Sequence, residues 1–530
     1  MAAGGAKSDD PQPFPVKEQL PGVDFCISTS PPWPEALLHG FQHYLVMLGT
    51  TVIISSTIVP LMGGGYEEKA EVINTLLFVS GINTLMQTFL GTRLPVVIGG
   101  SNAFMISTIS IALSTSDSSV LVNPQQRFKE SMRDVQGALI VASFFTMVIG
   151  FFGFWRVFIR FFSPLATAPL VILTGLGLYA NGFPHLSRCI EIGLPALIAV
   201  VFLSQYSPRL LKSKGAMLDR FAILFSVAII WVYGEILTAA GVYDNRSPKT
   251  QFSCRTDQSG LIGPAPWIRI PYPFQWGRPS FNAGHAVAAI AASFVSIIES
   301  TGTFIAASRY ASATPMPPFV HSRGVGWLGV GLLLNGLFGT GIGSTASVEN
   351  AGLLGLTRVG SRRVIHLSAL FMLFFSVFGK FGAVMASVPL PIVAALHCVL
   401  FAYVASAGLG LLQFCNLNSF RTKFILGFSL FLGLSIPRYF NDYLLVSGHG
   451  PVHTPSTWFN NVMQVMFSSS ATLAIVVAFF LDCTLGYGDT SVGRDNGSQW
   501  YEKFRNFNAD SRTECFYALP GNLSRFFPSY

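Results

Sequence analysis

The chain has 530 residues and a formal net charge of +8, and 51% of its residues are hydrophobic while only 11% are charged. A soluble domain carries about 25% charged residues, and single hydrophobic cores stop growing at about 250 to 300 residues. The composition therefore excludes an ordinary soluble enzyme and predicts that lipid surrounds most of the chain, in agreement with a mean hydropathy of +0.52.

The chain begins with a polar, acidic and Pro-rich stretch that ends at Pro34. A cleavable signal peptide would instead show a basic region followed by a short apolar run. We therefore expect residues 1–35 to form an N-terminal tail, and the first membrane segment to act as its own insertion signal.

Long runs without Asp, Glu, Lys or Arg mark the expected membrane segments, because a helix needs about 20 mostly apolar residues to cross the hydrocarbon. These runs, with their Gly/Pro breaks and basic flanks, predict an all-α polytopic membrane protein of fourteen segments. We place the segments at 37–61, 72–91, 94–113, 135–155, 163–183, 190–205, 219–241, 284–308, 325–344, 345–356, 363–386, 389–413, 420–437 and 460–483.

The basic residues predict the orientation of these segments. The even-numbered short loops hold 14 Lys and Arg residues, and the odd-numbered short loops hold 6. Because positively charged loops stay inside, we expect both tails, 1–35 and 484–530, to be cytoplasmic and the loop at 242–283 to be extracellular. Topology thus accounts for the net charge, and no basic-aromatic platform for nucleic acid lies outside the expected membrane segments.

Two of the expected segments are poor helices. The third opens with a Pro and puts Gly-Gly-Ser-Asn, at 99–102, at membrane depth, and the tenth is short, Gly-rich and carries Glu349. Lipid cannot satisfy free N–H and C=O groups, so irregular backbone is tolerated there only inside protein or beside a cavity. Short, interrupted segments at matching places mark inverted-repeat transporters. We therefore predict two inverted repeats of seven segments, at 36–241 and 284–483.

Two carboxylates lie inside expected membrane segments, where an ionisable group costs at least about 2.5 kcal/mol. Glu299 follows a long charge-free stretch in the eighth segment, and Glu349 opens a Glu-Asn-Ala-Gly run in the tenth. Either one alone could be a structural hydrogen-bond acceptor. Two of them on matching segments favour a solute site, where a carboxylate accepts from ring N–H groups and could also carry a proton.

Other polar and aromatic residues of these segments have two interpretations. Gln42 and His43, in the first segment, could orient the site or relay a proton, or they could form a helix–helix hydrogen bond. Asn350 could bind a ligand or a neighbouring helix. Phe104 could stack on a planar ring, although a chain with 47 Phe residues uses most of them in packing.

The sequence has no Walker Gly-Lys-Ser/Thr motif, no metal-spaced His/Cys cluster and no soluble domain that could hold a catalytic site. We therefore expect neither an enzyme nor a cofactor or metal, and we expect transport to draw on an ion gradient. The seven cysteines are too scattered for a metal site, and the pairing of Cys189 with Cys254 stays open. Glycosylation of Asn245 also stays open, because a Pro follows its acceptor motif.

From Glu349 the sequence reads Glu-Asn-Ala-Gly-Leu-Leu-Gly-Leu-Thr-Arg, which resembles the signature of the nucleobase-ascorbate transporter family. That signature is Gln, Glu or Pro, then Asn-x-Gly, four variable residues, and Thr followed by Arg, Lys or Gly. Every fixed position matches. The Gln42-His43 pair, the stretch 100–104 and Glu299 resemble further motifs of the family, and residues 41–50 resemble its plant branch. The resemblance runs from about residue 33 to residue 485.

The resemblance implies a core domain of segments 1–4 and 8–11 that rocks against a gate domain of segments 5–7 and 12–14, usually in a homodimer. It also implies short strands in segments 3 and 10, with the substrate between them. By position, Glu299 and Glu349 would bind the ring and Phe104 would stack on it. The amides of Ala103, Phe104 and Val348 would add backbone contacts. Further contacts, selectivity and coupling would involve Asn350, Thr357, Arg358, Gln42, His43 and Thr303.

Two departures from the family pattern bear on function. Relatives place an Asp or His tied to cation coupling where this chain has Thr303, and Asn102 stands where many relatives have an aromatic or small residue. Glu349 resembles the first signature residue of nucleobase members, whereas ascorbate carriers tend to have Pro there. We therefore expect a plasma-membrane carrier for xanthine, urate, uracil or related bases, coupled to protons rather than sodium. The alternatives are a sodium-coupled ascorbate carrier, and a channel or non-transporting receptor on the same scaffold.

Overall fold

The computed structural model describes residues 19–118, 123–210, 215–257, 263, 266–386, 388–485, 495–498, 511–521 and 523. The helices of the first half are α1 (Trp33–Met62), α2 (Tyr66–Phe89), α3 (Met105–Ser118), α4 (Pro124–Phe151), α5 (Phe154–Arg160), α6 (Pro164–Leu176), α7 (Phe183–Leu186), α8 (Ile190–Val201), α9 (Ser207–Leu210), α10 (Gly215–Arg220), α11 (Ala222–Ala239) and α12 (Pro248–Cys254).

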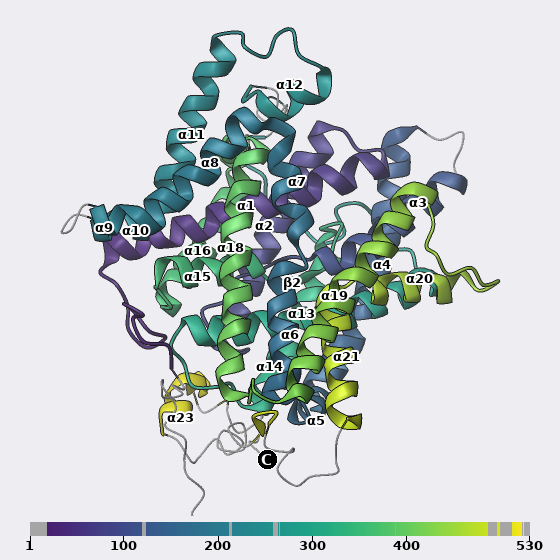
Figure 1. Cartoon of the computed structure of the whole chain (residues 1–530). Coiled ribbons are helices and arrows are strands. Elements are labelled where there is room, and N and C mark those ends of the chain that lie inside the picture. Colours follow the sequence, from purple (N-terminus) through teal and green to yellow (C-terminus); the bar gives the residue numbers. More distant parts are fainter. Residues whose placement is uncertain are drawn as a thin grey trace, which may run out of the picture.

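The second half repeats this helical character. Its helices are α13 (Ala283–Tyr310), α14 (Pro318–Phe338), α15 (Val348–Thr357), α16 (Arg362–Val377), α17 (Gly379–Ala386), α18 (Leu390–Leu411), α19 (Phe420–Ser447), α20 (Thr457–Phe467), α21 (Ser470–Thr484) and α23 (Ser511–Tyr517). Helices of the two halves interleave: α4 packs along α14, α6 along α18, and α2 along α16 (Figure 1).

Two short strands meet at the centre of this arrangement. β1 (Ile98–Gly100) pairs antiparallel with β2 (Ser344–Ala346), with Gly99 opposite Thr345. The approach to α1 is so close that a Cβ at Gly99 would lie 2.0 Å from Met47 Cε. A strand with a side chain at that position would displace the methionine.

Hydroxyl groups of neighbouring helices complete the hydrogen bonding of the strands. The amide of Ile98 donates to Thr84 Oγ1 of α2 at 2.9 Å, and the amide of Ala346 donates to Ser300 Oγ of α13 at 3.2 Å. Buried backbone groups without a partner cost several kcal/mol in a lipid environment. These side-chain acceptors let extended backbone exist at the centre of a helical membrane protein.

The prediction of a helical, multi-pass membrane protein is confirmed, but the count of fourteen segments is not. Among the described residues, eight helices are long and apolar enough to cross a membrane, and the bent pair α20–α21 makes a ninth if it forms one span. The segment expected at 345–356 is split between β2 and the 10-residue helix α15, and the one expected at 460–483 bends by 82° between α20 and α21. Fourteen segments and inverted repeats stay predictions.

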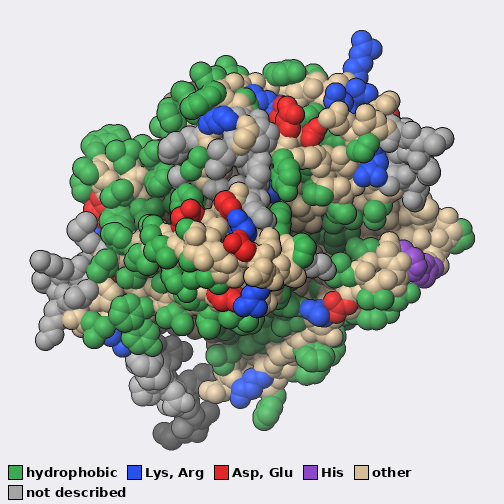
Figure 2. Space-filling model, turned by 90° about the horizontal axis from the view of Figure 1, so that it is seen from above, with side chains coloured by type: hydrophobic (Ala, Val, Ile, Leu, Met, Phe, Trp, Pro, Cys, Tyr) green, Lys and Arg blue, Asp and Glu red, His purple; other side chains and the backbone are tan. Residues whose placement is uncertain are grey.

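Apolar side chains cover much of the face that Figure 2 shows. Within the most apolar stretch of each helix, 72% of the residues of α1 are buried, against 28% for α19. Phe431 on α19 is 68% exposed and Phe152 after α4 is 77% exposed. Such apolar surface is unfavourable in water, so its position on the peripheral helices fits contact with lipid.

Segments from both tails pack against loops of the membrane part. Arg323 at the start of α14 donates to the carbonyl of Tyr517 at 2.9 Å, and Arg362 donates to that of Phe516 at 2.5 Å. At the other tail, the amide of Asp24 donates to the carbonyl of Arg358 at 3.0 Å. Arg323, Arg358 and Arg362 lie in loops that the sequence predicts to be cytoplasmic. The contacts therefore place parts of both tails beside these loops.

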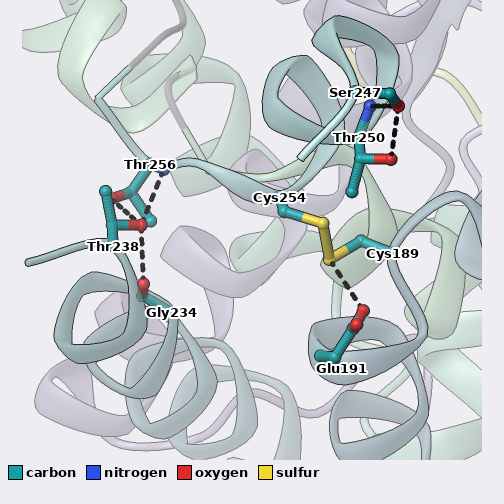
Figure 3. Close-up of a disulfide and its surroundings, with 8 residues drawn as sticks. All are labelled: Cys189, Glu191, Gly234, Thr238, Ser247, Thr250, Cys254 and Thr256. Atoms are coloured by element: carbon teal, nitrogen blue, oxygen red, sulfur yellow. Dashed lines mark hydrogen bonds between the residues drawn. A yellow bond between two sulfur atoms is a disulfide. The ribbon is translucent and has the colours of Figure 1, made fainter. Parts of the chain in front are cut away.

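A disulfide joins Cys189 to Cys254, with their Cα atoms 5.5 Å apart (Figure 3). It connects the short turn before α8 to the end of α12, and thereby ties the 242–283 loop to the helical body. The sequence leaves this pairing open, and the structure contains it.

In the same loop, Asn245 is exposed, and Ser247 of its acceptor motif caps α12 through the amide of Thr250 at 3.4 Å.

Candidate functional site

A cavity of about 400 Å³ lies beside the paired strands. One wall comes from α1, the turn after β1, α13 and the start of α15. The other comes from α6, the 177–188 segment, the end of α19 and the α20–α21 bend. The polar residues of the lining are Thr57, Asn102, Thr174, Asn181, His185, Arg188, Glu299, Asn441, Ser468, Ser469 and Ser470.

Glu299 is the carboxylate of this cavity, and it projects from the middle of α13. Ser469 donates a hydrogen bond of 2.9 Å to its Oε1 atom. The same serine is the N-cap of α21, where its Oγ accepts from the amide of Thr472 at 3.4 Å. The break between α20 and α21 therefore brings a hydroxyl group to the carboxylate.

Ala103 and Val348 also line the cavity, as the sequence predicts for the two segments that carry the strands. Ser101 occupies two of the expected backbone donors: its Oγ accepts from the amide of Ala103 at 3.2 Å, and its carbonyl accepts from that of Phe104 at 3.3 Å. The Phe104 ring is fully buried and does not line the cavity. In this conformation Phe104 is part of the hydrophobic core.

Glu349 is not among the lining residues, and its side chain is only 5% exposed. Thr50 of α1 donates to its Oε1 atom at 2.5 Å, and the same hydroxyl lies 3.4 Å from Nε2 of His397 on α18. The two carboxylates that the sequence pairs therefore occupy different environments. Glu299 faces the cavity, whereas Glu349 lies behind it in a buried polar cluster.

The polar pair of the first segment lies away from the cavity. Gln42 donates to the carbonyl of Arg220 at the end of α10 at 3.0 Å. The carbonyl of His43 accepts from Nδ2 of Asn350 at 3.2 Å, which links α1 to α15. The Gln42 side chain thus makes a helix–helix hydrogen bond, whereas His43 contributes only its backbone carbonyl, and the role of its side chain stays open.

The remaining sequence-predicted residues make local contacts. The hydroxyl of Thr303 donates to the carbonyl of Glu299 at 3.0 Å, and that of Thr357 donates to the carbonyl of Leu353 at 2.8 Å. Arg358 ends α15 in the left-handed region, with φ of 58°, and its side chain is exposed. Thr303 thus adjoins the cavity carboxylate through the backbone, and Arg358 stands apart from it.

The sequence does not single out most polar residues of the cavity lining, Ser469 among them, nor the buried pair Thr50 and His397. Thr50 and His397 are polar positions inside long charge-free runs, a signal that many structural Thr and His residues share. The triple serine at 468–470 interrupts the apolar sequence of the last expected segment, and this interruption could have indicated the break between α20 and α21.

Comparison with known proteins identifies the family. The model of the permease family matches residues 34–441. Nucleobase-ascorbate transporter 4 of Arabidopsis thaliana is 66% identical over 99% of both chains, and nucleobase-ascorbate transporter LPE1 of Zea mays is 58% identical over 99% of both. The solved structure of SLC26A9 aligns with 76% of this chain and 61% of that chain at a TM-score of 0.45 and 14% identity, which is too weak to bear on function. The chain is therefore a multi-pass membrane transporter rather than an enzyme, and it belongs to the permease family, among the nucleobase-ascorbate transporters.

Proposed function

We propose that this transporter takes up purine or pyrimidine nucleobases, such as xanthine, urate or uracil, together with protons. The observation that carries the proposal is Glu299, a carboxylate on the wall of a cavity of about 400 Å³. Ligand pockets have volumes of about 300 to 1,000 Å³ and hold a few placed polar groups in a largely apolar wall. A carboxylate in such a wall can accept hydrogen bonds from the N–H groups of a base and can exchange a proton.

The proposed mechanism is alternating access between a core domain and a gate domain. The cavity has walls from both expected domains: α1, α3, α13 and α15 belong to the core, and α6 and α19–α21 belong to the gate. A rocking motion of one domain against the other would therefore open and close the cavity around Glu299. The contact between Ser469 and Glu299 joins the two domains in the observed conformation.

The orientation of the cavity supports an outward-open state. Its lining includes His185, Arg188 and Asn441, which lie in loops expected to be extracellular. Away from the cavity, Arg220 pairs with Glu35 at 2.7 Å in a region expected to be cytoplasmic. The disulfide supports the same orientation, because disulfides persist in oxidising compartments. We place the protein in the plasma membrane as a homodimer, with both termini inside.

Uptake measurements test this proposal directly. Cells that lack their own carriers would express the protein and receive radiolabelled xanthine, uracil or ascorbate, with and without a protonophore. We expect saturable base uptake that falls when the proton gradient collapses, and that is lost in Glu299→Gln. The matched control is Glu235→Gln, because Glu235 is exposed on α11 and accepts its hydrogen bond from Thr256 outside the cavity.

Other outcomes identify the alternatives. Sodium-dependent uptake of ascorbate alone would show that the substrate and the coupling ion are both different from those proposed. Binding of a base without any flux would identify a receptor, and flux that does not saturate would identify a channel.

A further inference from the structure

Glu349 is sealed from the cavity, yet it is connected to another titratable side chain through one hydroxyl group. Thr50 Oγ1 donates to Glu349 Oε1 at 2.5 Å and lies 3.4 Å from His397 Nε2. All three side chains are at most 6% exposed. With the Thr50 proton on the carboxylate side, the hydroxyl oxygen is free to accept from the imidazole in the tautomer that carries its proton on Nε2.

The helix that carries His397, α18, packs against the 179–186 segment, which contributes to the cavity wall. Nδ1 of His397 is buried and has no hydrogen-bond partner of ordinary geometry among the described residues. Asn181 and His185 both line the cavity. The imidazole therefore stands between the cavity wall and the Thr50–Glu349 pair.

We propose that His397 and Thr50 form a proton relay that loads Glu349 from the cavity. A proton that arrives at Nδ1 allows the Nε2 proton to pass to Thr50 while the Thr50 proton passes to Glu349. The products are a neutral histidine with its proton on Nδ1, an intact threonine and a protonated carboxylic acid. Tautomerisation of the imidazole, or a flip of its ring, returns a protonated nitrogen to the side of Thr50 and restores the starting state of the relay.

This inference rests on the proposed proton-coupled function, and it gives that function a connection between protonation and domain movement. Thr50 and Glu349 belong to the expected core domain, while His397 belongs to α18 of the expected gate domain. The relay is complete only while α18 is docked against α1. Core–gate movement would therefore connect and disconnect Glu349 from its source of protons.

The surroundings of His397 are sparse in charge. The titratable groups that face it are His185 on α7 and, through Thr50, Glu349 on α15, and Arg188 stands beside His185. Its ring stacks on Phe401 of its own helix with centroids 4.9 Å apart. The stacking on Phe401 restricts the orientation of the ring.

The test is the pH profile of initial base uptake by the full-length protein. His397→Gln keeps a side chain that can donate a hydrogen bond but cannot titrate, and Thr50→Val removes the hydroxyl at nearly constant volume. We expect both variants to lower uptake at acidic pH by about tenfold, which is the change in a protonation equilibrium that corresponds to one pKa unit. Their uptake should also depend less on pH than that of the wild type. Thr50→Ser should restore it, because serine supplies the same hydroxyl.

Two matched variants control for packing. Thr51→Val removes a buried hydroxyl of α1 that bonds within its own helix, to the carbonyl of Met47, and His321→Gln removes a buried imidazole of α14. Both should keep the wild-type profile, and surface labelling should show equal amounts of each variant at the membrane. A wild-type profile in His397→Gln would overturn the relay and leave the proposed function intact. Wild-type uptake that does not depend on the proton gradient would overturn the proposed function and the relay together.

Discussion

Ser469 donates a hydrogen bond of 2.9 Å to Glu299 and so joins the start of α21 to the middle of α13 across the cavity. Hydrogen bonds to charged groups contribute about 1.5 to 3 kcal/mol. We expect Ser469→Ala to leave Glu299 with one partner fewer, and to raise the KM for a base about tenfold. Ser429→Ala is the control, because this buried serine of α19 bonds within its own helix, to the carbonyl of Leu426. An unchanged KM in Ser469→Ala would show that the serine does not act on the carboxylate.

Gly352 of the signature segment allows α15 to approach α18. A Cβ at this position would lie 2.1 Å from the carbonyl oxygen of Leu400, a backbone atom that cannot rotate away. We expect Gly352→Ala to force the two helices apart, to lower the free energy of unfolding by about 1 to 3 kcal/mol and to abolish uptake. Thermal unfolding in detergent and uptake would be measured together. Gly410→Ala on α18, with no atom within 4 Å of the added Cβ, should behave as wild type.

The disulfide between Cys189 and Cys254 closes a loop of 65 residues in sequence separation. In the chain-entropy model, a loop of this length contributes about 4 kcal/mol to stability. Cys189→Ser, Cys254→Ser and the double variant should therefore lose similar stability, and a reducing agent should lower the unfolding midpoint of the wild type alone. Cys398→Ser removes a half-buried free thiol and provides the control. If reduction leaves the wild-type midpoint unchanged, the bond does not stabilise the loop.

Arg220 links α10 to the start of the chain through Glu35 at 2.7 Å and Asp24 at 3.1 Å. These side chains are 21 to 39% exposed, so each pair contributes at most about 1 kcal/mol. If the pairs hold the outward-open state, Arg220→Gln should raise the apparent KM for external substrate by up to about fivefold, the change that 1 kcal/mol produces. Arg255→Gln breaks ion pairs in the 242–283 loop and should leave KM unchanged. A lower KM in Arg220→Gln would contradict this role.

Glu299 and the irregular third and tenth segments could be predicted from the sequence for one reason. Ionisable side chains and broken helices are costly in lipid, so their presence there indicates a function. The position of Glu349 behind the cavity could not be predicted, because helical periodicity does not say which neighbour a side chain meets. Thr50 and His397 are 347 residues apart in sequence, and only tertiary packing brings them together. The bend between α20 and α21 is a different case, because the triple serine at 468–470 interrupts the apolar sequence at the bend.

The contacts of Arg323 and Arg362 make the C-terminal segment part of the membrane body. Arg323 is 2% exposed, and each of these two guanidinium groups donates once to the C-terminal segment, at the carbonyls of Tyr517 and Phe516, and once to the membrane part, at the carbonyls of Gly91 and Arg93. A chain truncated before α23 would leave the buried guanidinium of Arg323 with one acceptor fewer. Residues 511–517 are therefore a poor place to cut or to insert a reporter, even though they lie far from the transport cavity in sequence.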